Sequence, residues 1–314
     1  MENLQLGQKG QFEASVLFNK YLRKCFHRLG LQLTGAGAEA FAKTRPGQFA
    51  QFDISTVALP PPEAIPEELK DVAAKQILLR RPFSFARVAR EKTGTTAVEV
   101  VYCVLGPATL RLTTLAKGQS INVIGPLGNG FPVPQGNKKK AILVAGGMGS
   151  PPLEHLAQVL TAEAPKVDVI AFAGAKTKDD LPFEKVLDKI SQELGFWLAE
   201  FARYSISSFV ATDDGSAGFK GLVSNCILDW FKQDNINPAE IIIYACGPKA
   251  MLASIAALAA QKRIDCFVSM EEMMACGIGL CQSCAVKTKQ DGTGEHYKLC
   301  CKDGPVFDAK DVVF

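Results

Sequence analysis

The residues best able to do chemistry lie near the C-terminal end of the chain, where cysteines recur at short intervals. Three of them form a C-x4-C-x2-C pattern, namely Cys276, Cys281 and Cys284. Cys300 and Cys301 both offer a fourth thiolate. The spacing is typical of loops that hold a [2Fe–2S] cluster, although the last gap is shorter here. Gly277 and Gly279 would let such a loop bend around the cluster, because glycine tolerates positive φ and close backbone approach.

A structural zinc ion is the alternative occupant, since four thiolates also suit tetrahedral zinc. Zinc sites usually combine two short C-x2-C units, whereas here three cysteines share one loop and the fourth is remote. The spacing therefore favours iron–sulfur over zinc, and disulfide pairing ranks below both. An electron-transfer cluster needs a donor and an acceptor, so the rest of the chain must supply or bind them.

Length and composition limit the classes of protein to consider. The 314 residues allow two or three domains. A hydrophobic content of 47% with 21% charged residues is ordinary for a globular protein, and a net charge of +3 gives no support for nucleic-acid binding. The first ten residues are polar, and no run of about 18 apolar residues predicts a membrane span. We expect a cytoplasmic protein without nucleic-acid or membrane partners.

The first part of the chain predicts an antiparallel β-barrel or sandwich. Short apolar segments recur at about ten-residue spacing, as all-β domains show. These strands are expected at 49–54, 77–79, 98–105 and 120–124. Residues 12–33 predict one strand or an amphipathic segment whose basic residues, including Arg28, face solvent. The Pro- and Glu-rich residues 59–70 predict a surface loop.

The sequence R-P-F-S at Arg81–Ser84 is expected to close a strand of that first part. Its arginine could hold a phosphate and its serine offers a hydroxyl. A strand end with a surface arginine is the simpler interpretation of these residues alone.

The middle of the chain predicts a doubly wound α/β domain, because continuous apolar runs alternate with helix-period segments. Strands are expected at 141–145, 167–173, 208–212 and 241–245, and helices at 153–160, 181–193, 222–234 and 249–262. The turn at 146–149, G-G-M-G, lies between a strand and a helix, where backbone N–H groups can bind a diphosphate. A plain tight turn explains it equally well. Cys246 ends another strand, at the edge where ligands bind, but alone it is more simply a small buried residue.

Taken together, these motifs resemble one family. R-P-F-S, G-P-L-G-N-G-F, G-G-x-G-x-x-P, C-G-P-K-A-M and the cysteine pattern followed by C-K-D-G-P-V-F occur in this order. The chain resembles the electron-transfer subunits of NAD-dependent dihydroorotate dehydrogenases, within the ferredoxin-reductase superfamily, from about Arg45 to Phe314. The resemblance implies a flavin-binding antiparallel β-barrel at 1–132, a doubly wound NAD-binding α/β domain at 133–262 and a small [2Fe–2S] domain at 263–314.

The resemblance also implies which residues bind FAD, NAD and the cluster. The residues expected at FAD are Arg81 on the diphosphate, Pro82, Phe83, Ser84 near the flavin N5, and Thr109. The residues expected at the nicotinamide nucleotide are Gly147, Gly149, Pro152, Cys246, Gly247 and Pro248. The expected cluster ligands are Cys276, Cys281, Cys284 and Cys301, because the family's fourth ligand directly precedes K-D-G-P-V-F. Ser84 and Cys246 are the expected catalytic residues. The G-P-A-T before and at Thr109 departs from the family's G-x-G-T and leaves Pro107 without a role.

The implied activity is electron transfer in pyrimidine biosynthesis. Electrons from an FMN-containing dihydroorotate dehydrogenase catalytic subunit, expected in a heterotetramer, would pass through the cluster and FAD to NAD⁺, with NADP left open. A second interpretation keeps these cofactors but serves a hydrogenase, a glutamate synthase-like enzyme or a ferredoxin, because residues 1–43 and 59–70 depart from the family pattern. A zinc-stabilised binding protein without flavin is disfavoured by the intact R-P-F-S and G-G-M-G motifs.

Overall fold

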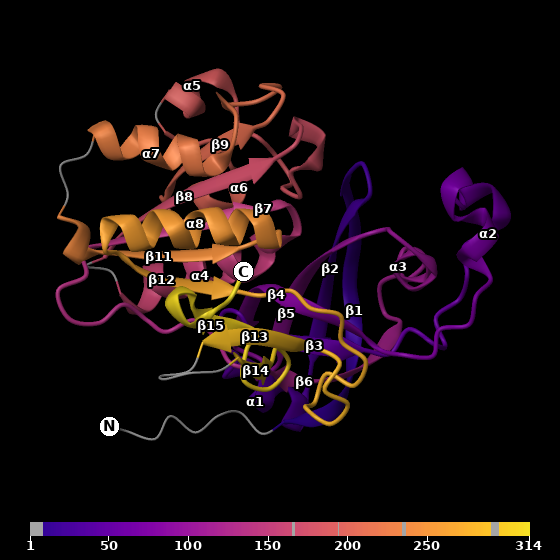
Figure 1. Cartoon of the computed structure of the whole chain (residues 1–314). Coiled ribbons are helices and arrows are strands. Elements are labelled where there is room, and N and C mark those ends of the chain that lie inside the picture. The colour runs from indigo at the N-terminus through magenta and orange to yellow at the C-terminus, as the bar shows by residue number, and fades with distance from the viewer. Residues whose placement is uncertain (1–8, 165–166, 194, 234–236, 290–294) are drawn as a thin grey trace.

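The computed structural model describes residues 9–164, 167–193, 195–233, 237–289 and 295–314. The chain forms a β-barrel, a sheet covered by helices, and a C-terminal segment that lies against both (Figure 1). No helix within these ranges is long and apolar enough to span a bilayer.

The barrel is closed and antiparallel, with the strand order β1-β2-β5-β4-β3-β6. Its strands are β1 (Gly10–Arg23), β2 (Phe26–Leu33), β3 (Phe49–Phe52), β4 (Arg81–Arg90), β5 (Thr96–Cys103) and β6 (Ser120–Leu127). Successive residues of a strand face opposite sides, and Leu29, Leu31 and Leu33 are fully buried inside the barrel. The helices α1 (Gly35–Ala42), α2 (Lys70–Ala73) and α3 (Pro107–Leu112) lie in the connections. The predicted antiparallel barrel is confirmed.

Some predictions about individual strands of the barrel were wrong. Residues 77–79 form no strand, and R-P-F-S opens β4 instead of closing a strand, because Arg81 is the first residue to pair with β3, opposite Phe52. Residues 12–33 contain two strands, which turn at Lys24 with a left-handed φ of 49°. The Pro-rich stretch carries two short 3-10 turns before α2.

The second body is a sheet with the order β10-β9-β8-β7-β11-β12-β15, parallel except for β15. Its strands are β7 (Lys140–Gly146), β8 (Asp168–Ala175), β9 (Ser207–Thr212), β10 (Phe219–Lys220), β11 (Ile241–Cys246), β12 (Asp265–Ser269) and β15 (Val306–Asp308). Ile142 and Val144 face the core shared with α7 and α8, whereas Ala141 and Leu143 face the core shared with α4. Helices thus cover both faces, as the doubly wound prediction required.

The helices of this sheet match the sequence prediction except that one is shortened and that α6 (Ala199–Ala202) was not predicted. They are α4 (Ser150–Glu163), α5 (Lys189–Glu193), α6 (Ala199–Ala202), α7 (Val223–Gln233) and α8 (Lys249–Lys262). The helix expected at 181–193 is reduced to α5. Pro182 disfavours helical backbone at the residue before it. Leu181 and Phe183 are instead buried in the core between the sheet and α4.

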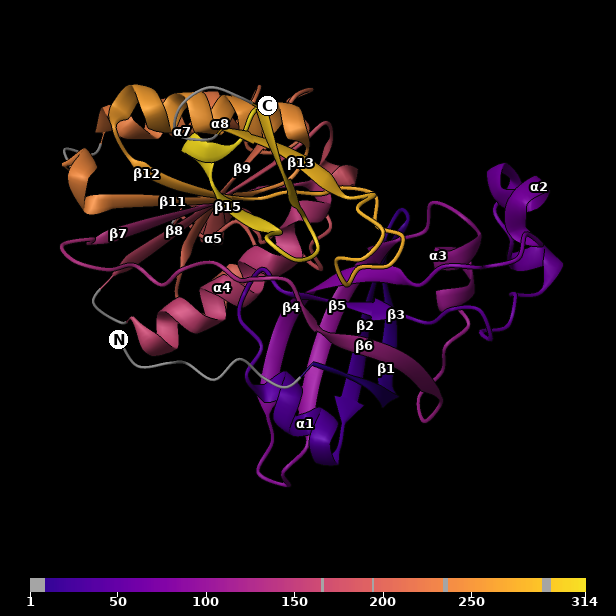
Figure 2. The same cartoon turned by 60° about the horizontal axis from the view of Figure 1, so that its bottom comes forward.

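The C-terminal segment begins and ends in the sheet. After β12 the chain forms what we call the cysteine loop (residues 271–284), then the hairpin β13 (Ala285–Lys289) and β14 (Glu295–Leu299), and returns as β15 beside β12. Figure 2 shows the loop lying between the sheet and the barrel. The proposed domain boundaries at 132 and 262 stay a prediction, and the second one separates β12 and β15 from the other strands of their sheet.

Candidate functional site

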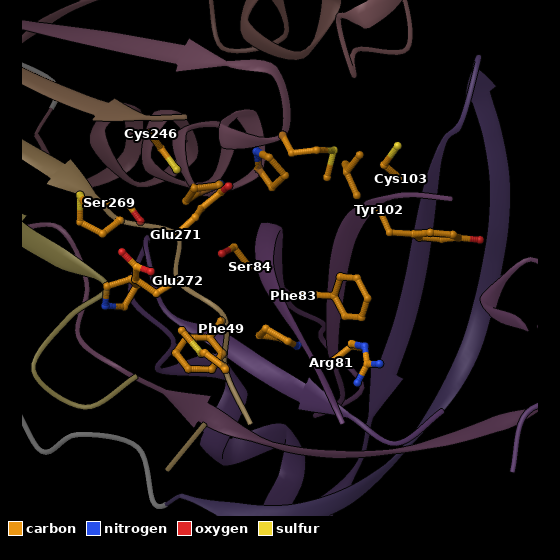
Figure 3. A pocket seen from close by; sticks show the side chains of 18 of the residues that line it. Phe49, Arg81, Phe83, Ser84, Tyr102, Cys103, Cys246, Ser269, Glu271 and Glu272 are labelled. Carbon is orange, nitrogen blue, oxygen red and sulfur yellow. The ribbon is translucent and has the colours of Figure 1, made fainter. Parts of the chain in front are cut away.

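A pocket of ≈ 350 Å³ lies where the barrel, the sheet and the start of the cysteine loop meet (Figure 3). Its lining includes seven of the residues predicted to bind FAD or the nicotinamide nucleotide: Arg81, Pro82, Phe83, Ser84, Thr109, Pro152 and Cys246. The other predicted nucleotide residues, Gly147, Gly149, Gly247 and Pro248, do not line it but form the two turns at its edge. The structure therefore brings residues far apart in the sequence to one place.

Aromatic side chains form one wall of the pocket. The Phe83 ring lies 5.0 Å from the Phe52 ring and 6.4 Å from the Tyr102 ring, both in edge contacts. The Tyr102 hydroxyl donates to Asn19 Oδ1 at 3.0 Å, which fixes that ring. An apolar wall with few polar groups suits a flat ring system such as a flavin.

Arg81 lines the pocket, and its surroundings differ from those of its neighbour Arg80. Arg80 donates to Asn122 Oδ1 at 2.7 Å and pairs with Asp53 at 3.2 Å, so its charge is compensated. Arg81 donates only to the carbonyls of Leu79 and Arg80 and has no carboxylate partner within the described ranges. An uncompensated guanidinium on a pocket rim fits a phosphate group, which accepts its N–H donors.

Thr109 holds the turn that leads into α3. Its Oγ1 accepts from the backbone N–H groups of Leu105 at 3.0 Å and Gly106 at 3.3 Å. Pro107 is the first residue of α3, where a missing N–H costs no helical hydrogen bond. The departure from G-x-G-T is therefore compatible with the turn, and Pro107 has a structural role.

The glycine turn after β7 packs against the end of β11. A Cβ on Gly149 would lie 2.0 Å from the Cys246 carbonyl oxygen, so only glycine allows the two strand ends to approach this closely. Gly147 adopts a positive φ of 48°. These glycines place Cys246 beside the pocket.

Cys246 and Ser84 point toward the same space (Figure 3). Cys246 is 3% exposed, and burial raises the pKa of its thiol well above the usual value. It is therefore a neutral thiol at physiological pH, not a thiolate nucleophile. Ser84 pairs with Phe49 across β3 and β4, which aims its hydroxyl into the pocket.

Glu271 is a pocket residue that sequence reasoning missed. It lies near Ser269 and Cys246 at the pocket, with part of its side chain exposed (Figure 3). Burial of the rest raises the pKa of its carboxyl. The carboxyl is therefore protonated more easily than that of an ordinary glutamate. Its position two residues after a parallel strand could have pointed to it, but β12 was not predicted.

The cysteine loop and the turn after β14, which carries Cys301, arrange the four predicted ligands as two pairs. Cys276 Sγ accepts from the N–H of Cys281 at 3.4 Å, and Cys284 Sγ accepts from the N–H of Cys301 at 3.4 Å. Hydrogen bonds from the Ser283 side chain and backbone lower the pKa of Cys281 to about 6. A [2Fe–2S] cluster needs this distribution, since each of its two irons takes two ligands. Among the described residues, no three or more Cys, His, Asp or Glu side chains are grouped to hold a single ion.

Cys300 and Cys301 differ in their contacts. Cys300 is fully buried and its Sγ donates to the Met270 carbonyl at 3.3 Å. Both backbone N–H groups donate to Cys284: that of Cys300 to the carbonyl at 2.9 Å, and that of Cys301 to Sγ at 3.4 Å. The Cys300 thiol is thus engaged by a carbonyl, whereas the backbone of Cys301 lies at the sulfur of another predicted ligand, which fits Cys301 as the fourth ligand.

Comparisons with family models and curated proteins identify domains and relatives that this chain is similar to. Residues 271–313 match the model described as the iron-sulfur cluster binding domain of dihydroorotate dehydrogenase B, and residues 143–257 match an oxidoreductase NAD-binding domain. A protein of Bacillus cereus (strain G9842), named dihydroorotate dehydrogenase B (NAD(+)), electron transfer subunit, is 35% identical over 95% of this chain and 96% of its own. A protein of the same name from Bacillus anthracis (strain CDC 684 / NRRL 3495) is 34% identical over the same shares.

Solved structures share the fold. The NADH-dependent reduced ferredoxin-NADP oxidoreductase, studied for flavin-based electron bifurcation, superposes with a TM-score of 0.70 at 24% identity, covering 96% of this chain and 89% of its own. A ferredoxin NADP⁺ reductase from Neisseria gonorrhoeae with bound FAD and NADP gives a TM-score of 0.53 at 14% identity, covering 80% and 91%.

Proposed function

The chain belongs to the family of dihydroorotate dehydrogenase B electron transfer subunits, and on that premise we propose that it carries electrons from a dihydroorotate-oxidising partner to NAD⁺. The observation that carries the proposal is the shared pocket. R-P-F-S on the barrel, Cys246 at the end of the sheet and the first residues of the cysteine loop all line it. One pocket thus adjoins the proposed FAD, NAD and cluster sites.

The proposed roles of the pocket residues follow from their surroundings. When bound, FAD exchanges hydride with the nicotinamide and the cluster passes single electrons. Arg81 binds the FAD diphosphate with its uncompensated charge, and Phe83 packs on the flavin ring. Ser84 and Cys246 line the space for the nicotinamide as neutral polar groups. Glu271 presents a carboxyl at the same place.

We assign the cluster to Cys276, Cys281, Cys284 and Cys301. The backbone N–H groups of Ile278 and Cys281 donate to Cys276 Sγ at 3.5 and 3.4 Å, as expected for a loop built around a sulfur ligand. Such donors stabilise the thiolate that an iron requires.

The partner is proposed to dock beside the cysteine loop, because that loop exposes large apolar side chains. Met273 is 89% exposed, Leu280 is 76% exposed and Ile278 is 47% exposed. Contiguous exposed apolar groups are typical of protein–protein interfaces. We propose that the partner is an FMN-containing catalytic subunit and that the complex is a heterotetramer.

The test is dihydroorotate-driven NAD⁺ reduction by the anaerobically purified native complex, with the co-purifying chains identified. Cys301→Ser should abolish this activity and the iron–sulfur absorbance while FAD is retained. Cys300→Ser is the matched control, because a serine hydroxyl can still donate to the Met270 carbonyl, and it should keep both cofactors. A yellow-brown complex that oxidises NADH with artificial acceptors but ignores dihydroorotate would overturn the assigned pathway and leave the cofactor chemistry standing.

A further inference from the structure

The side chain of Gln51 lies buried between the barrel and the cysteine loop. It is fully buried on β3, and neither its Oε1 nor its Nε2 has a hydrogen-bond partner. Buried amides are nearly always hydrogen-bonded, because an unpaired polar group loses its water without compensation. An unpaired amide at this place therefore indicates a partner that is not part of the protein chain.

The backbone of Gly277 in the cysteine loop lies against the Gln51 side chain. A Cβ at that position would lie 2.1 Å from Gln51 Nε2, 2.7 Å from its Cγ and 2.8 Å from its Cδ. Gly277 also has a positive φ of 70°, which disfavours other residues. The loop thus places bare backbone against the Gln51 amide, directly after the proposed ligand Cys276.

The short strand β3 connects the two sites. Phe49 and Gln51 are two residues apart and so face the same side of the strand. Phe49 lines the pocket and pairs with Ser84, whereas Gln51 pairs with Pro82 and contacts the cysteine loop. Figure 3 shows Phe49 at the lower edge of the pocket. One strand therefore adjoins both the flavin pocket and the loop.

We propose that Gln51 is a positioning residue that tunes the cluster: its Nε2–H donates a hydrogen bond to a sulfur atom of the cluster held by the cysteine loop. The inference rests on the proposed cluster site. Hydrogen bonds to cluster sulfurs favour the more negative, reduced state and so raise the reduction potential. A neutral amide does this without placing a charge between the two redox sites.

The experiment uses the anaerobically purified complex with Gln51→Met, which keeps the length of the side chain and removes its N–H donors. Redox titration followed by electron paramagnetic resonance should show a lower midpoint potential for the cluster. We expect the one-electron equilibrium constant to fall about tenfold, which corresponds to about 59 mV. Iron and FAD contents should not change.

The matched control is Gln32→Met. Gln32 is a barrel glutamine on β2 whose Nε2 donates to Thr95 Oγ1 at 3.2 Å instead of facing the loop. Its substitution should leave the potential and the spectrum of the cluster unchanged.

Two results would overturn the proposal. One is an unchanged potential and spectrum in Gln51→Met. The other is a folded, FAD-containing variant that takes up no cluster, which would assign Gln51 to packing of the loop. If Gln51→Met does not fold, Gln51→Asn is measured in the same way, because it withdraws the amide by one methylene. Failure of the proposed function would be visible without any variant, as an unsubstituted complex that lacks the cluster signal or ignores dihydroorotate.

Discussion

The barrel meets its two neighbours through surfaces of opposite character. Its contact with the sheet contains a buried ionic cluster, beside neutral bonds such as that from Gln158 Nε2 to the Val88 carbonyl at 2.7 Å. Arg28 on β2 is 4% exposed and pairs with Glu154 on α4 at 2.7 Å, Glu99 on β5 at 3.1 Å and Glu200 on α6 at 3.7 Å. We call these four residues the Arg28 cluster. The hairpin of β1 and β2 adds exposed pairs to the same side, among them Lys24 with Asp180.

The contact between the barrel and the C-terminal segment is instead neutral. Asn129, just after β6, donates from its backbone N–H to the Gly304 carbonyl at 2.6 Å and from its side chain to the Asp303 carbonyl at 2.7 Å. Its Oδ1 accepts from the N–H of Val306 at 3.1 Å. Backbone and amide groups thus join the two parts.

The difference between the two contacts has a physical reason. Charges in a protein interior act over long distances and shift the potentials and pKa values of groups nearby. The ionic contact holds α4, and with it the glycine turn, against the barrel. The neutral contact fixes the segment beside the proposed cluster without adding a charge there.

The largest effect is expected from removing the only cation of the Arg28 cluster. Arg28→Met leaves buried carboxylates uncompensated and should lower the free energy of unfolding by about 3–5 kcal/mol. Urea denaturation of the FAD-saturated protein measures it. Arg87→Met is the control, since Arg87 also pairs with Glu99 but from an exposed position, and it should cost at most about 1 kcal/mol. Equal losses in both variants would contradict the assignment of the cluster as the main ionic contact.

The same cluster predicts a pH dependence. Burial, and secondly the nearby Glu154 carboxylate, raise the pKa of Glu200 from 4.5 to about 7. The folded state therefore binds this proton more tightly than the unfolded state, and the stability that it contributes is lost as the pH rises from about 4.5 through about 7. Glu200→Gln, which can still accept from the N–H of Glu184, should gain stability over the unsubstituted protein across this range, on the order of 3 kcal/mol by pH 8. A difference independent of pH in paired urea titrations would refute this.

The neutral contact should respond to the loss of Asn129. Asn129→Ala leaves the N–H of Val306 without its acceptor and should cost about 1–2 kcal/mol. The loss should appear as faster release of iron during dilution into chelator, with FAD binding unchanged. Asn122→Ala, at an asparagine on β6 that bonds within the barrel, is the control and should not release iron faster. Equal release from both variants would show that this contact does not hold the segment.

The smallest effect is expected at the exposed hairpin pair. Lys24→Met removes the pair with Asp180 on the surface, where water and salt screen the charges. Urea midpoints at low and high salt should match those of the unsubstituted protein. A clear salt-dependent loss would mean that the hairpin contributes to the ionic contact as much as the Arg28 cluster does.

Local patterns were enough to predict much of the fold and of the site. The apolar run at 141–145 predicted β7, and the R-P-F-S motif and the cysteine spacing marked positions that the structure brings to or beside the pocket. Contacts between distant segments could not be predicted. Arg28 was predicted to face solvent, but it is buried. Its partners lie on β5, α4 and α6, far from it in the sequence, so no local pattern could have predicted them. The roles proposed for Gln51 and Glu271 depend on residues that the fold brings near them from distant parts of the sequence. The sequence alone therefore did not point to either residue.

Because the chain returns as β15, the whole segment between β12 and β15 is attached to the sheet at a single place. Ser269 and Val306 pair directly across neighbouring antiparallel strands, so the excursion leaves and re-enters the sheet about one strand spacing apart. Antiparallel neighbours can also be joined by a two-residue turn. An ancestral or designed reductase could therefore gain or lose the whole segment at this one junction, with the order of the other strands unchanged.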